Sequence, residues 1–141
     1  MQREVARPAC GVLPDELVDR LTGGVDYSAG DTLPVGKGSG VCTIRSRGDT
    51  YLVATVKDLP TKARVEELRG ELSESRAYVK QHCDEATMLN EPGYGYTCID
   101  DGEVHIDIVT KRQLIRLILP SKTERPTVEM GLDIARIIAG K

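Results

Sequence analysis

Residues 92–120 read PGYGYTCIDDGEVHIDIVTKRQLIRLILP, and they set the architecture of the chain. Apolar and polar residues alternate between positions 103 and 108, as is typical of a strand with one buried and one solvated face. The polar members of this alternation are Glu103, His105 and Asp107. Turn-forming residues precede it at 100–102 and follow it at 110–112. The stretch therefore predicts three consecutive antiparallel strands.

The rest of the chain supplies helices and one more pair of strands. Proline and glycine mark the element boundaries, and the apolar residues between them follow helical or strand periods. The expected elements are a helix after Pro14, strands at 41–46 and 51–59, a long helix at 62–85 and a last helix from Pro126. We predict an α+β fold, an antiparallel sheet of about five strands covered by helices, in the order α-β-β-α-β-β-β-α. This is a single-domain sandwich.

A glycine-rich loop spans residues 24–40 and is too long to be only a connector. Its segment 30–38 approaches the spacing of a phosphate-binding loop, but it has one extra residue between the glycines and Gly38 where Ser or Thr would hold magnesium. The loop is therefore expected to be either a flexible connection or a functional segment of another kind.

The chain has 141 residues, which suits one domain, predicted at 10–141 after a linker or expression remnant at 1–9. The net charge of −3 argues against nucleic acid as a partner, because non-specific binding to it requires a concentrated positive field. One alternative is a local basic patch, although solvated surface charge is the simpler interpretation. Its members would be Lys111, Arg112, Arg116, Lys122 and Arg125.

The four cysteines, Cys10, Cys42, Cys83 and Cys98, are widely spaced and include no Cys-x-x-Cys pair. No metal site or cofactor is expected, since structural zinc usually needs paired close ligands. Disulfides are the favoured interpretation, and the most local of three pairings joins Cys10 to Cys42 and Cys83 to Cys98. The alternative is four reduced cysteines in a cytosolic protein.

Disulfides would place the domain in an oxidising compartment. We therefore expect an extracytoplasmic, cell-surface location. No stretch is apolar enough to span a membrane, and the first residues lack the apolar core of a signal peptide. The expectation is that a signal or anchor is missing from this chain, that Met1 is an added start codon, and that contact with the membrane occurs only through that anchor.

The element order, with residues 8–13 before a short helix and residues 40–43 opening a strand, resembles one known family. This is the actinobacterial family of small secreted lipoproteins and membrane-anchored ectodomains of unknown function. The resemblance extends to residues 93–95, the three-strand region and residues 132–135, with Ile44 where that family has Trp. It implies a fold similar to the extrinsic P subunit of photosystem II, an antiparallel sheet between helices. It brings no catalytic residues.

Two groups of residues are candidates for a ligand site. Glu103, His105 and Asp107 would project from one strand face about 6 to 7 Å apart and could bracket a metal or a polar ligand. A solvated strand face is the alternative. Tyr94 and Tyr96 would share a face and could form an aromatic binding surface, or they could pack under the long helix.

The leading hypothesis is a non-enzymatic extracytoplasmic binding or interaction domain of an actinobacterial membrane-anchored protein or lipoprotein. Its partner would be another envelope protein or an extracellular ligand. The alternatives are a small metal-dependent or hydrolytic enzyme centred on Glu103, His105 and Asp107, and a cytosolic regulatory subunit with free thiols. A deep pocket at those three residues would favour the enzyme, whereas a flat exposed face would favour the binding domain.

Overall fold

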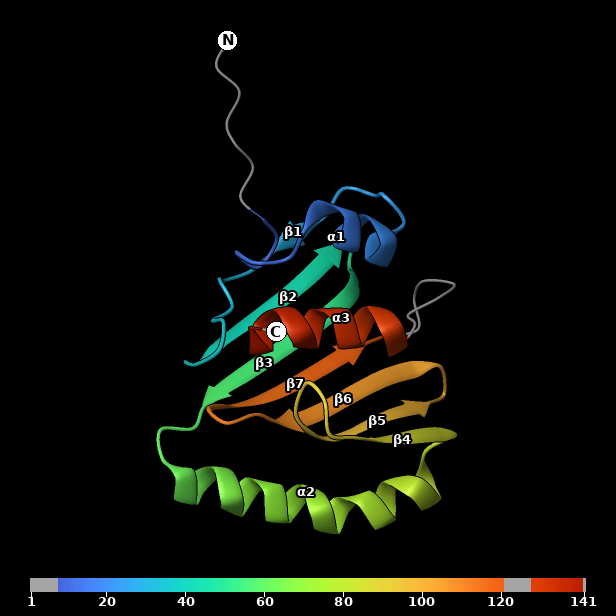
Figure 1. The fold of residues 1–141 in the computed structure, drawn as a ribbon. Helices are drawn as coiled ribbons and strands as arrows, with labels where there is room; N and C mark the ends of the chain where they lie inside the picture. Colours follow the sequence, from blue (N-terminus) through green and yellow to red (C-terminus); the bar gives the residue numbers. More distant parts are fainter. Residues whose placement is uncertain (1–7, 121–127, 141) are drawn as a thin grey trace.

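The computed structural model describes residues 8–120 and 128–140 and has an α+β fold (Figure 1). Of the predicted linker, residues 1–7 lie outside the described part, as does Pro126. The elements are α1 (Asp15–Thr22), β1 (Ser28–Ala29), β2 (Gly40–Ser46), β3 (Asp49–Asp58), α2 (Lys62–His82), β4 (Glu85–Leu89), β5 (Tyr94–Asp100), β6 (Glu103–Val109), β7 (Gln113–Leu119) and α3 (Val128–Ala139).

One antiparallel sheet contains all seven strands, in the order β1-β2-β3-β7-β6-β5-β4. The strands predicted from residues 92–120 are β5, β6 and β7, which pair in sequence order. The hairpin β2–β3 joins them through β3, which pairs with β7 from Val53 opposite Ile118 to Asp58 opposite Gln113. This central pairing makes one sheet from two segments that α2 separates in sequence.

The prediction of about five strands was too low, because it missed β1 and β4. β1 has only two residues, too few for a period to show. The long helix was expected to reach residue 85, the first residue of β4, but it ends at His82, and no strand was predicted between this helix and residue 92. Cys83 takes an extended backbone conformation (φ −87°, ψ 148°), and Ala86 pairs with Cys98. Pairing with β5 and the disulfide therefore override the helical spacing of the apolar residues.

The sheet has helices on both faces, as side-chain alternation along β6 shows. Val104, Ile106 and Ile108 belong to a core with α1 and α3, whereas Val109 belongs to a second core with α2. The largest buried residues of the first core include Leu13, Leu21, Ile44, Leu52, Leu117 and Ile134. The second core consists of Leu59, Val65, Leu68, Leu72 and Val109, with Tyr94, Tyr96 and Leu114 packed against it.

Helix α2 packs over β4, β5 and β6, so the same face of the sheet is more open along β2 and β3 (Figure 1). Val41 on β2 has 51% of its surface exposed, and Arg45, Thr55 and Lys57 are also exposed. None of the helices in the described part of the chain combines the length and apolarity needed to cross a lipid bilayer.

Both predicted disulfides are present. Cys10 joins Cys42, which ties the segment before α1 to β2, and Cys83 joins Cys98, which ties the end of α2 to β5. The described cysteines include no free thiol. The two bonds secure opposite parts of the sheet.

The glycine-rich loop at 24–40 is anchored rather than free along its second half. Leu33 is 1% exposed, and its N–H donates to the Cys10 carbonyl at 2.7 Å. The Gly36 N–H donates to the Ile138 carbonyl at 2.8 Å, and the Gly38 N–H donates to Asp58 Oδ1 at 2.9 Å. The loop therefore makes hydrogen bonds both to the C-terminal end of α3 and to the end of β3.

Replacement of Gly95 by Ala is expected to lower the free energy of unfolding by about 2–3 kcal/mol. A Cβ at this position would lie 1.8 Å from the Asp107 carbonyl oxygen, so β5 and β6 would have to move apart. Chemical denaturation measures the change. Gly70→Ala is the matched control, because it adds the same methyl group in open space inside α2 and should raise stability by roughly 0.5–1 kcal/mol. Equal stability of Gly95→Ala and the wild type would contradict the close approach.

Candidate functional site

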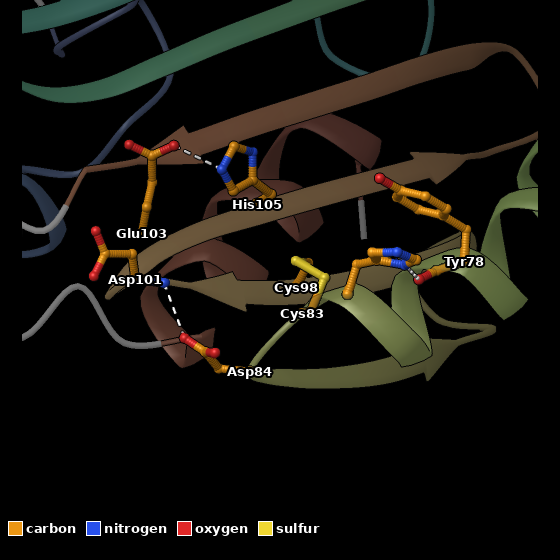
Figure 2. The surroundings of a disulfide bond; sticks show 8 residues. Tyr78, Cys83, Asp84, Cys98, Asp101, Glu103 and His105 are labelled. Carbon is orange, nitrogen blue, oxygen red and sulfur yellow. Dashed lines mark hydrogen bonds and ion pairs between the residues drawn. A yellow bond between two sulfur atoms is a disulfide. The ribbon is translucent and has the colours of Figure 1, made fainter.

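The predicted trio on β6 separates into two pairs. Glu103 Oε1 lies 2.6 Å from His105 Nε2, and Figure 2 shows this pair beside the Cys83–Cys98 disulfide. Asp107 instead accepts a hydrogen bond from Arg116 Nε at 2.9 Å. The three side chains therefore do not converge on one site.

The Asp107 carboxylate also acts on the Tyr96 hydroxyl. The register explains this arrangement, since Tyr96 lies directly opposite Asp107 on β6, and Asp107 lies directly opposite Arg116 on β7. Burial raises the pKa of Tyr96 to about 12, helped by the charge and hydrogen bond of Asp107 and opposed by Arg116. Asp107 thus lies between Tyr96 and Arg116 on the two neighbouring strands and is paired with Arg116.

The surroundings of the Cys83–Cys98 disulfide are acidic but do not form a metal site. Asp84 Oδ2 accepts a hydrogen bond from the Asp101 N–H at 3.0 Å (Figure 2). His82 stacks on Tyr78 of its own helix, with ring centroids 3.9 Å apart. Across residues 8–120 and 128–140, no three His, Cys, Asp or Glu side chains are grouped so that they could hold a metal ion.

The two predicted tyrosines face α2 but belong to different surroundings. Tyr96 lines a cavity of about 520 Å³ on one flank of α2, together with Leu68, Leu72 and Arg116. Tyr94 lines a larger cavity at the end of the sheet. Both tyrosines are half-buried against the core under α2. The structure thus places them under the long helix and at the edges of two separate cavities.

The larger cavity, here called the end cavity, has a volume of about 800 Å³. Three segments form most of its walls, namely the start of α2 with the preceding Pro60 and Thr61, the β4–β5 loop at residues 90–93, and the β6–β7 turn at residues 110–112. Gly36 and Ala139 also line it. Apolar lining comes from Pro60, Val65, Pro92 and Val109, beside Tyr94. Glu103, His105 and Asp107 line neither of the two cavities.

Arg76 fixes the loop that forms one wall of the end cavity. Its Nη2 donates to the carbonyls of Leu89 and Gly95, at 2.7 and 3.1 Å, and these two residues are the last pair before the loop. Its guanidinium carbon lies 3.8 Å from the centre of the Tyr94 ring. The loop and Tyr94 are therefore held in place by one side chain of α2.

The basic patch considered as an alternative is divided by the fold. Lys111 and Arg112 line the end cavity, whereas Arg116 is paired with Asp107. Lys122 and Arg125 lie outside the described residues. Lys62 and Arg69 of α2 are the cavity cations that sequence analysis missed. Their place in the cavity follows only from the fold, which brings α2 close to the β6–β7 turn, since both residues lie more than 40 residues before that turn in the chain.

No family model matches this sequence, and no significant match was found among curated proteins or solved structures. The resemblance to the actinobacterial lipoproteins and ectodomains therefore stays a prediction.

Substitution of Asp107 by Asn should lower the pKa of Tyr96 from about 12 toward the ordinary value near 10. The Asp107 carboxylate disfavours a neighbouring phenolate, so its neutralisation eases ionisation. A raised pKa in the folded state stabilises the fold below pH 10, and this contribution is lost as pH rises from 10 to about 12. Tyrosine-selective NMR across an alkaline titration measures the shift.

Asp101→Asn is the control for this titration. It removes the same charge from the β5–β6 turn, where the residue has a φ of 52° that Asn tolerates. Tyr96 should titrate unchanged in this variant. If Asp107→Asn also leaves the pKa of Tyr96 unchanged, the Asp107 carboxylate does not act on the Tyr96 hydroxyl in solution.

Proposed function

We propose that this chain is a non-enzymatic extracytoplasmic binding domain, part of an actinobacterial membrane-anchored protein or lipoprotein, whose end cavity binds an extracellular ligand. The observation that carries the proposal is that cavity. Its volume of about 800 Å³ lies within the roughly 300–1,000 Å³ of small-molecule sites. Its lining joins apolar residues, among them Pro60, Val65, Pro92 and Val109, to polar groups of the kind that fix the orientation of a ligand in such sites.

The two disulfides support the location. Cys10–Cys42 and Cys83–Cys98 suggest folding in an oxidising, extracytoplasmic environment. The attachment to a membrane and the place at the cell surface are proposals that rest on the resemblance to actinobacterial lipoproteins and ectodomains.

The position of the end cavity favours binding over reaction. Its side is formed by the turn after β6, whereas the Glu103–His105 pair lies at the start of that strand. Six residues separate the two ends, which corresponds to roughly 20 Å along a strand. The Glu103–His105 pair, which carries the groups best suited to acid–base chemistry, is therefore remote from the end cavity.

The walls of the end cavity are supported before any ligand arrives. Val65 belongs to the core under α2, and Arg76 holds both ends of the 90–93 loop. On the third side, the Leu59 N–H donates to the Arg112 carbonyl at 2.7 Å. A preformed site loses less conformational entropy on binding, which favours affinity for a small ligand.

Protein recovered from an oxidising compartment should contain two disulfides and no reactive thiol. Alkylation before reduction should add no mass, and alkylation after reduction should add four groups, with peptide mapping linking Cys10 to Cys42 and Cys83 to Cys98. Replacing Cys83 and Cys98 together by Ser should lower the free energy of unfolding by about 3 kcal/mol, because a loop of this length is no longer closed in the unfolded chain. Four reactive thiols in such protein would remove the support for export.

Small fragments should bind at the end cavity. A pool of neutral, anionic and cationic monocyclic fragments is added to ¹⁵N-labelled protein, and amide shift changes should cluster at residues 61–66, 90–94 and 109–112. Tyr94→Leu should weaken the best fragment about 5- to 10-fold, because it removes an aromatic wall. Tyr78→Leu, which changes a tyrosine with 64% of its surface exposed, should have no effect. Shift changes confined to the open faces of β2 and β3 would contradict the proposal.

A further inference from the structure

The end cavity concentrates positive charge in a chain that is negative overall. The charged residues that line it are Lys62, Arg69, Lys111, Arg112 and Glu66. Four cations to one acid is the reverse of the chain's balance of 19 basic and 22 acidic residues. Clustering of one sign around a concave surface focuses the electrostatic field and attracts the opposite charge.

These four cations do not take part in ion pairs among the residues that the structure describes. Four arginines elsewhere do, since Arg20 and Arg136 pair with Asp133, Arg64 with Glu67 and Arg116 with Asp107. The difference between the paired arginines and the unpaired cavity cations matters, because positive charges gathered without acidic partners repel one another. The end cavity therefore keeps its positive charge available to a ligand.

The backbone at the cavity reinforces this preference. Helix α2 has no acidic residue in its first turn and begins with Lys62, whereas α1 begins with Asp15 and Glu16. Acidic residues are the usual complement to the positive end of a helix dipole, and a lysine there is unfavourable. An anion in the cavity would lie near both the helix end and the lysine, and it would relieve their repulsion.

The cations are presented on supported segments. In the β6–β7 turn, Thr110 Oγ1 accepts hydrogen bonds from the N–H groups of Arg112 and Gln113, at 3.3 and 3.0 Å. This fixes the turn from which Lys111 and Arg112 project. The guanidinium carbon of Arg69 lies 4.8 Å from the centre of the Tyr94 ring, a cation–π contact that holds it against the aromatic wall.

We infer that the end cavity binds a small organic anion, in which a carboxylate or phosphate group contacts Lys62, Lys111 and Arg112 while an apolar body rests against Pro60, Val65 and Pro92. This inference rests on the proposed function, because it names the class of ligand for the same cavity. Carboxylate and phosphate share the recognition chemistry, since both accept hydrogen bonds from lysine and arginine.

Four probes with one phenyl body test the inference, namely benzoate, phenyl phosphate, benzamide and benzylamine. Titration into the ¹⁵N-labelled protein should give affinities for the two anions at least 10-fold higher than for benzamide, with shifts at residues 61–66 and 109–112. Benzylamine should not bind there. The ratio between benzoate and phenyl phosphate then distinguishes a carboxylate ligand from a phosphate ligand. Raising the salt concentration should weaken the binding of the two anions and leave the affinity for benzamide unchanged.

Charge reversal provides the matched comparison. The double variant Lys111→Glu/Arg112→Glu should lose at least 10-fold in affinity for both anions and retain its affinity for benzamide. Arg45→Glu/Lys57→Glu makes the same change of charge on the open sheet face and should alter anion binding less than 2-fold. Both pairs are exposed, and unchanged thermal unfolding would show that each variant is folded.

Equal binding of benzamide and benzoate at the cavity would overturn the inference and leave the proposed function intact. The same holds if only neutral or cationic members of the fragment pool bind there. Equal losses in the two charge-reversal variants would also overturn it, since attraction would then come from net charge. If no fragment of any class binds at the cavity, both the inference and the proposed function fail.

Discussion

The antiparallel pairing of β3 with β7 is the contact on which the rest of the structure depends. It joins the β2–β3 hairpin to the three later strands, and it continues past the last paired residues through the Leu59 N–H and the Arg112 carbonyl. The chain then turns into α2 at Pro60. The pairing therefore brings the first turn of α2 beside the β6–β7 turn, and the end cavity forms where these two segments meet the β4–β5 loop.

Helix α2 serves the core and the cavity at the same time. Its apolar residues pack on the sheet, while Arg76 crosses to the backbone at both ends of the β4–β5 loop. This placement has a cost, because Arg76 Nε is buried and has no hydrogen-bond partner in the described residues. The two carbonyl hydrogen bonds and the stacking on Tyr94 offset it. A charged side chain is thus used to position a wall of the cavity.

Local patterns predicted those parts of the fold that local forces determine. The alternation at 103–108 and the turns around it correspond to β6 and its two connections. Pairing of each cysteine with its nearer neighbour gave both disulfides. β4 was missed because Cys83 and Ala86 continue the helical spacing of α2, and only the backbone conformation of Cys83 and the pairing of Ala86 with β5 show that the chain is extended there. Such pairing is a property of two distant segments and leaves no period in either one.

The candidate site was less predictable for the same reason. The spacing of Glu103 and His105 correctly places them on one face, but the partner of Asp107 is decided by the register of β6 against β7, which brings Arg116 opposite it. The end cavity depends on the approach of residues 62 and 111, which no local pattern encodes.

The distribution of charge shows how the fold changes the meaning of composition. Asp84, Asp100, Asp101 and Glu103 lie where α2 ends and β5 turns into β6, whereas Lys62, Lys111 and Arg112 lie at the opposite ends of the same elements. The net charge of −3 averages over these two ends. It bears on binding to an extended polyanion, which must contact a broad surface. A small anion responds only to the field within about a Debye length, roughly 8 Å at physiological salt, so the cavity end attracts it despite the acidic total.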